Sequence, residues 1–255
     1  MEYLVEQCLL FLISLIANGL SAMAGGGAGL LQFPALLFLG LSFTVALATH
    51  KVASVALGVG ATFRHLREKR LSWKFALHIL IFGLPGVILG AMLILSVPDD
   101  IARIVLGFLT MGLGVYSWLK PELGLQARAR QFVSWQWLVG GIVLFLIGLL
   151  NGSITSGTGL FVTLWLVRWY GLDYQRAVAY TLILVGMLWN GMGALTLAMQ
   201  TPVKWEWVFP LVLGALLGGY LGAHLSIAKG SQLVKRCFEG VTILVGLSLI
   251  IDGSF

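Results

Sequence analysis

Long apolar stretches separated by short polar loops run along the chain. The uninterrupted stretches are residues 43–63, 74–96, 101–119, 177–199, 207–228 and 234–251. Most of them have about the 20 residues that a helix needs to cross the hydrocarbon core of a bilayer. A helix satisfies all of its backbone groups within one segment, so it is the expected form of such a stretch in lipid. The pattern predicts an all-α polytopic membrane protein.

Two further apolar helices are each interrupted by a run of glycine and small polar residues. The first run is AGGGAG at residues 24–29, and the second is NGSITSGTG at residues 151–159. Backbone groups released by such a break are tolerated at membrane depth only where they line protein or a cavity, and paired breaks point to a transport site. We therefore expect two broken or re-entrant helix hairpins that meet near the bilayer midplane.

The two halves of the chain repeat one another at an offset that drifts from 130 to 132 residues. Gly27 aligns with Gly157, and GVILGA at residues 86–91 aligns with GGYLGA at residues 218–223. The matches keep their order and their spacing along both halves, which indicates a duplication. The predicted units are a first repeat at residues 1–119, a cytoplasmic linker at residues 120–134 and a second repeat at residues 135–255.

Loop charges place equivalent loops of the two repeats on opposite sides of the membrane. Lys and Arg collect in cytoplasmic loops. Residues 64–74 carry five of these cations, whereas the equivalent loop at residues 199–206 carries only Lys204. Residues 97–103 are poor in cations, whereas their counterpart at residues 228–236 is rich in them. Equivalent loops on opposite sides require an odd number of crossings per repeat, so we predict two inverted repeats.

Five helical segments per repeat fit this arrangement. Each repeat begins with a hairpin, at residues 4–40 and 135–170, and continues with three ordinary spans. The N-terminus lacks the basic region of a cleavable signal, so the first apolar stretch is expected to remain as a span. Both chain termini are then predicted outside. The returning arms at residues 28–40 and 160–170 are short, and the sequence leaves open whether they span or re-enter.

Composition excludes several classes of protein. The chain is 59% hydrophobic and 10% charged, with a mean hydropathy of +0.97, which leaves too little polar surface for a soluble domain. The net charge of +6 comes from cations in short loops, where they orient spans, so we expect no nucleic-acid partner. Cys8 and Cys237 show neither a disulfide framework nor metal-ligand spacing. We expect no metal and no cofactor, and the expected partners are the lipid bilayer and a small anionic substrate.

The glycine runs have the chemistry of an anion site. A helix that begins after a glycine turn directs unpaired N–H groups and its positive end at the space before it. Gly25, Gly26, Gly27 and Gly29 let a ligand approach the backbone closely. Alternatively, the small residues at these breaks serve only close packing of helices. The second break offers further candidate ligands in Asn151, Ser153, Thr155, Ser156 and Thr158.

Lys51 is the most unusual side chain in the predicted spans. It lies well inside the stretch at residues 43–63, roughly 12 Å from its start by helical rise. An unpaired charge there costs at least about 2.5 kcal/mol. We expect an anionic ligand as its partner, and helix-end carbonyl groups or a neutral lysine are the alternatives. His50 is a candidate to bind the anion or carry a proton, or else a structural residue. Weaker candidates for the lining are Asn18, Gln32, Thr49, Thr181 and Asn190.

The first break lies in a sequence that resembles a known family. AMAGGGAGLLQFPALLFLGLSFTVALATHKVAS at residues 22–54 is similar to the first-repeat signature of the TauE/SafE sulfite exporter family, also called the 4-toluene sulfonate uptake permease family. Residues 25–29, Thr49 and Lys51 match that pattern, whereas TLILVGMLWN in the second repeat lacks the second lysine of some members. The resemblance implies bacterial inner-membrane proteins that move sulfite, sulfonates or other small sulfur-containing or organic anions, some of them coupled to protons.

The residues and the resemblance together favour a secondary transporter, a permease in which an anion binds between the hairpins while one repeat rocks against the other. A passive anion channel is the first alternative. A membrane enzyme is disfavoured because the sequence has no HExxH, no GxSxG, no phosphate-binding loop and no carboxylate pair in a span. A structural or assembly subunit would make no use of two equivalent breaks and a lysine at midplane depth.

Overall fold

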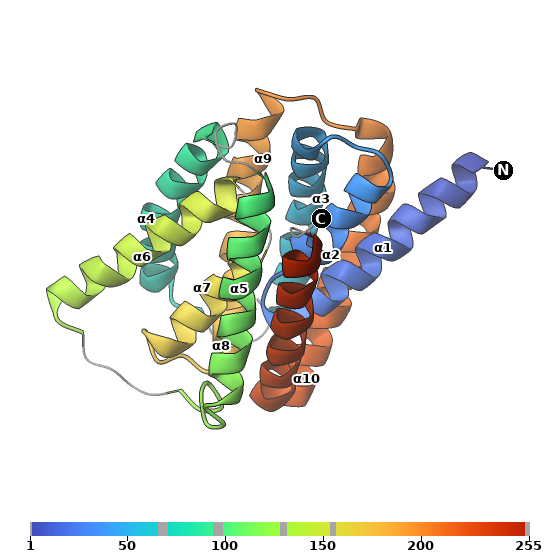
Figure 1. The fold of residues 1–255 in the computed structure, drawn as a ribbon. Helices are drawn as coiled ribbons and strands as arrows, with labels where there is room; N and C mark the ends of the chain where they lie inside the picture. The colour runs from blue at the N-terminus through green and yellow to red at the C-terminus, as the bar shows by residue number, and fades with distance from the viewer. Residues whose placement is uncertain (1, 66–70, 94–98, 128–131, 154–156, 253–255) are drawn as a thin grey trace.

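The protein is built from helices that pack side by side, with α1 extending to one side (Figure 1). The computed structural model describes residues 2–65, 71–93, 99–127, 132–153 and 157–252. These residues contain no strand, and six of the helices within them are long and apolar enough to cross a membrane. The prediction of an all-α polytopic membrane protein is confirmed.

The first half of the chain forms a broken hairpin followed by three longer helices. Its elements are α1 (Glu2–Ala24), α2 (Ala28–Phe38), α3 (Phe43–His65), α4 (Trp73–Leu93) and α5 (Asp99–Trp118). The returning arm α2 has 11 residues. A helix of that length rises only about 16 Å, which is about half the thickness of the hydrocarbon core. This arm is therefore too short to cross a bilayer by itself.

The second half has a similar order of elements. They are α6 (Ser134–Ser153), α7 (Thr158–Arg168), α8 (Tyr174–Tyr180), η3 (Thr181–Trp189), α9 (Asn190–Ala198) and α10 (Trp205–Asp252). The arm α7 again has 11 residues. Helices α8, η3 and α9 follow one another directly and form one segment with a π-helical middle. Such π-helical turns inside a helix are frequent at functional sites.

Helix α10 consists of two arms that meet at Gly230. This residue has φ 79° and ψ −179°, a conformation outside the helical region that glycine adopts readily. The sequence predicted a loop at residues 228–236 here. The structure instead continues both helices up to the glycine, because one residue with positive φ is enough to break the helix and redirect the chain.

The first helix of each half packs against the fourth segment of the other half. Helix α1 lies along the first arm of α10, and α6 lies along α4. A methyl group added at Gly218 would strike the backbone of Leu15, and one added at Gly86 would strike the backbone of Phe145. The two glycines lie 132 positions apart in the sequence and their partners 130. The predicted duplication has the same offsets and would account for the matched contacts. Its inverted orientation stays a prediction.

Candidate functional site

Both short helices begin at a glycine in the left-handed conformation. Gly27, before α2, has φ 98°, and Gly157, before α7, has φ 74°. No side chain caps either start. The first N–H groups of a helix have no partner within the helix, and they carry its partial positive charge. Each start is therefore suited to stabilise a negative charge placed before it.

The tips of the two hairpins are in direct backbone contact. A methyl group added at Gly26 would lie 2.6 Å from both the Cα and the carbonyl carbon of Gly159. Beside this contact, Thr163 Oγ1 donates a 2.6 Å hydrogen bond to the carbonyl oxygen of Gly25. Only a residue without a side chain permits such an approach. These glycines therefore allow the two hairpins to pack closely, which the sequence had left open as an alternative. Gly26 and Gly159 also line the cavity beside this contact.

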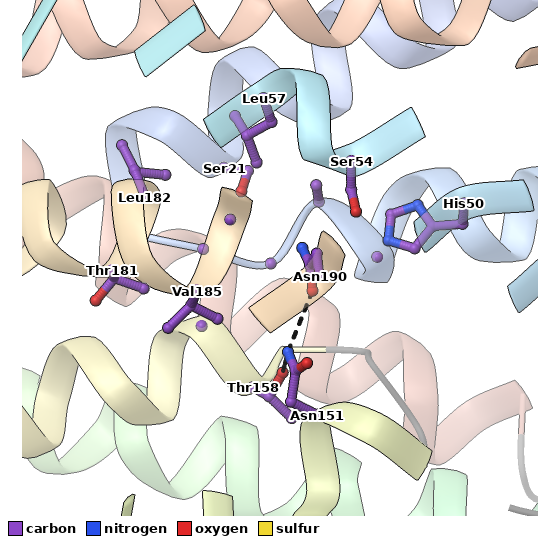
Figure 2. Close-up of a pocket in the computed structure, with 16 residues that line it drawn as sticks. Ser21, His50, Ser54, Leu57, Asn151, Thr158, Thr181, Leu182, Val185 and Asn190 are labelled. Atoms are coloured by element: carbon purple, nitrogen blue, oxygen red, sulfur yellow. Dashed lines mark hydrogen bonds between the residues drawn. The ribbon is translucent and has the colours of Figure 1, made fainter. Parts of the chain in front are cut away.

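A small cavity lies beside the hairpin contact. The volume open to the centre of a water molecule is about 30 Å³, which is room for about two waters. Figure 2 shows Asn190 between the pair Ser54 and His50 on one side and the pair Asn151 and Thr158 on the other. The described part of the lining contains no acidic side chain. The predicted site residues that line it are Gly26, Gly27, Gly29, His50, Asn151, Thr158, Thr181 and Asn190.

Two polar side chains on the lining have an atom without a hydrogen-bond partner. Ser21 is 1% exposed and His50 is 2% exposed. Among the described residues, neither Ser21 Oγ nor His50 Nδ1 finds a partner. Buried polar atoms are nearly always paired, and leaving one unpaired costs about 1–3 kcal/mol. The two atoms therefore indicate that a ligand or water completes the cavity.

Lys51 lies behind the lining rather than on it. Its side chain is fully buried, and Nζ donates to the carbonyl oxygen of Asn151 at 2.6 Å and to Asn151 Oδ1 at 2.9 Å. A longer bond of 3.4 Å reaches Asn190 Oδ1. Asn151 belongs to the last turn of α6, where carbonyl groups lack helical partners and carry partial negative charge. The partner of this lysine is therefore a helix end, the alternative to the anionic ligand that the sequence led us to expect.

Some weaker candidates are occupied with structural hydrogen bonds. Thr49 Oγ1 accepts a 3.0 Å bond from the backbone nitrogen of Lys204, in the loop just before α10. Asn18 Nδ2 donates a 2.9 Å bond to Gln32 Oε1 and so joins the two arms of the first hairpin. None of the three predicted residues lines the cavity.

The remaining predicted residues also lie off the cavity or cannot be placed. Ser153 Oγ donates to the carbonyl oxygen of Leu149 at 3.0 Å, within its own helix. Gly25 packs against Thr163 instead of facing the cavity. Thr155 and Ser156 lie outside the described residues.

The cavity includes residues that sequence reasoning missed, above all Ser21 and Ser54. Ser21 lies 130 positions before Asn151, and His50 lies 131 positions before Thr181. All four of these residues line the cavity. Their offsets are those of the predicted repeat, so extending the alignment from Asn151 back to the first half would have identified Ser21.

Known proteins similar to this chain cover almost its whole length. A family model described as "Sulfite exporter TauE/SafE" matches residues 10–249. "Probable membrane transporter protein ORF9" of Sinorhizobium sp is 30% identical over 247 residues, or 95% of this chain and 92% of that protein. "Probable membrane transporter protein YfcA" of Escherichia coli strain K12 is 29% identical over 245 residues, or 95% and 89%. "Probable membrane transporter protein" of Haemophilus influenzae is 28% identical over 244 residues, or 96% and 94%. No solved structure matches the chain.

Proposed function

Because the chain belongs to the sulfite exporter TauE/SafE family and is a membrane transporter, we propose that it moves a small anion across the membrane by alternating access. The substrate class is sulfite, a sulfonate or another small sulfur-containing or organic anion. The description of the family supports the first of these, and the chemistry of the cavity supports an anion in general. The protein is then a secondary transporter, not an enzyme.

One observation carries the choice of an anion: two uncapped helix starts and two unpartnered side chains meet at one cavity. Each helix start contributes roughly half a unit of positive charge. Gly27 and Thr158, at the starts of α2 and α7, both line the cavity, as do Ser21 and His50 with their unpartnered atoms. The described lining contains no acidic side chain, and the carbonyl end of α6 beside it is paired with Lys51, so a bound anion would be favoured.

The small volume of the cavity supports a carrier more than a channel. A space of about 30 Å³ accommodates about two waters, so a sulfur oxoanion fits only after the walls move apart. The contact between Gly26 and Gly159 forms part of those walls. We infer that separating the two hairpins admits the anion and that bringing them together encloses it. A passive channel, the alternative, would need a continuous open path.

Membrane placement and coupling form part of the same proposal. The protein resides in the bacterial inner membrane, with both termini outside and the cation-rich loop at residues 64–74 in the cytoplasm. Residues 120–134 form the cytoplasmic linker between two inverted repeats. A proton gradient is the driving force to examine first, because the resemblance to the family implies that some of its members are coupled to protons.

Replacing His50 with leucine is expected to reduce anion transport about tenfold to a hundredfold, because a hydrogen bond to a charged group contributes about 1.5–3 kcal/mol. The measurement is uptake of sulfite, thiosulfate and methanesulfonate into proteoliposomes, with and without a proton gradient. The native protein should show saturable uptake that is accelerated by anion on the opposite side of the membrane.

The matched control is His224→Leu, because His224 is exposed and hydrogen-bonds Arg64 away from the cavity. This variant should transport at the native rate. Uptake that rises linearly with concentration and ignores anion on the opposite side would indicate a channel. No uptake of any anion would indicate an assembly subunit and would contradict the proposal.

A further inference from the structure

Lys51 and two asparagines form a cluster directly behind the cavity. The lysine Nζ donates to Oδ1 of Asn151 at 2.9 Å and to Oδ1 of Asn190 at 3.4 Å. An ammonium group has three donors and no acceptor. Each amide must therefore turn its oxygen toward the lysine, and its NH₂ group faces elsewhere.

The NH₂ groups of the two asparagines face away from the lysine. Asn151 Nδ2 donates to Thr158 Oγ1 at 2.8 Å, at the first residue of α7, and to Asn190 Oδ1 at 3.4 Å. Figure 2 shows the nitrogen of Asn190 pointing away from Asn151. Both asparagines line the cavity. Both hydrogens of the Asn151 NH₂ group are thus used within the protein, and the orientation imposed by Lys51 leaves the NH₂ group of Asn190 as the amide donor on this wall.

Lys51 itself is held in place and kept off the cavity. It is fully buried, and its three acceptors are all protein oxygens. Its stem fits against Gly193, where an added methyl group would lie 3.1 Å from Lys51 Cδ. Reaching an anion in the cavity would require breaking the 2.6 Å bond to the carbonyl oxygen of Asn151. Direct contact between Lys51 and an anion would therefore leave the carbonyl end of α6 without its hydrogen-bond partner.

We propose that Lys51 is a positioning residue: it makes the cavity selective for anions by orienting the amides of Asn151 and Asn190, and it does not touch the substrate. The inference rests on the proposed function, because it assumes that an anion occupies the cavity. The ligand that fits an amide donor beside two helix starts is an oxoanion with its oxygens unprotonated, since each oxygen then accepts hydrogen bonds.

A second buried lysine provides a matched control. Lys235 is 6% exposed and donates to the carbonyl oxygen of Ser117 at 2.6 Å, in the last turn of α5, and to Glu239. It therefore pairs with a helix end as Lys51 does. Neither Lys235 nor its partners line the cavity. Replacing it tests what the loss of a buried lysine does to stability alone.

The experiment is a double-mutant cycle on anion affinity. Binding of radiolabelled sulfite to the purified full-length protein is measured for the native chain, Lys51→Met, Asn151→Ala, the double variant and Lys235→Met, with thermal melting of each. Each single change at the cluster should weaken binding about tenfold to a hundredfold. If Lys51 acts through the asparagine, the double variant should bind within about twofold of the weaker single variant.

The outcomes separate the inference from the proposed function. Lys235→Met should lower the melting temperature and leave sulfite affinity within about twofold of native, a change too small to reflect a lost hydrogen bond. Losses at Lys51 and Asn151 that multiply in the double variant would overturn the positioning role while the native protein still binds the anion. An equal loss of affinity in Lys235→Met would also overturn it. If the native protein binds neither sulfite nor any other small anion, the proposed function itself fails.

Discussion

An aspartate in place of Thr158 is expected to abolish anion binding while the protein stays folded. Thr158 is the first residue of α7, is fully buried and lines the cavity. A carboxylate there is stabilised by the helix start and can accept the hydrogen bond from Asn151 Nδ2. Its charge would, however, occupy the position proposed for the substrate. Two like charges about 4 Å apart repel by about 4 kcal/mol near a protein surface, which weakens binding about a thousandfold.

Thr158→Asn is the control, because asparagine has the shape of aspartate without its charge. It should bind sulfite within about tenfold of the native protein, since it can keep the hydrogen bond to Asn151 and adds no repulsion. The test is to measure equilibrium binding of sulfite and thermal melting for the native protein, Thr158→Asp and Thr158→Asn. Equal affinities of the aspartate and asparagine variants would show that no anion binds at the start of α7.

Alanine in place of Gly26 is expected to prevent the hairpins from closing and to stop coupled exchange of anions. The added methyl group would lie 2.6 Å from the Cα and carbonyl carbon of Gly159, and φ of Gly26 is 136°, which side chains rarely adopt. Overpacking costs about 1–3 kcal/mol and backbone strain a similar amount. Both costs fall on the closed state, so exchange of internal for external sulfite should fall at least about tenfold.

Gly40→Ala separates the cost of overpacking from the cost of backbone strain. Gly40 has φ 94°, but an added methyl group would meet no atom within 4 Å. This variant carries the backbone strain without the collision, and it should keep most of the exchange activity. If Gly26→Ala and Gly40→Ala exchanged sulfite at the same rate in proteoliposomes, the closure of the hairpins at Gly26 would play no part in transport.

The helices and the two breaks could be predicted from the sequence because their signals are local. A hydrophobic stretch of about 20 residues determines a span, and glycine runs determine where each hairpin turns. Residues 24–29 indeed lie at the end of α1 and the start of α2. The short returning arms were also evident from the sequence, which placed them at residues 28–40 and 160–170. The helices run from Ala28 to Phe38 and from Thr158 to Arg168.

The partners of polar side chains could not be predicted, because they depend on contacts between distant segments. Lys51 pairs with Asn151, 100 residues later in the chain. Its depth in α3 was evident from the sequence, but the end of α6 beside it was not. The π-helical turn at Thr181–Trp189 gave no signal either, since its residues are apolar like those of any span. Ser21 was missed because a single serine in an apolar helix usually serves helix packing.

The position of the bound anion is the most direct test of the site. Crystals grown with selenite, a heavier analogue of sulfite, would locate it by the anomalous scattering of selenium. The account predicts one selenium peak between the hairpins, within hydrogen-bonding distance of the helix starts after Gly27 and Gly157 and of Ser21 or His50, with Lys51 still bonded to Asn151. A selenium peak bonded directly to Lys51, or located away from both helix starts, would contradict it.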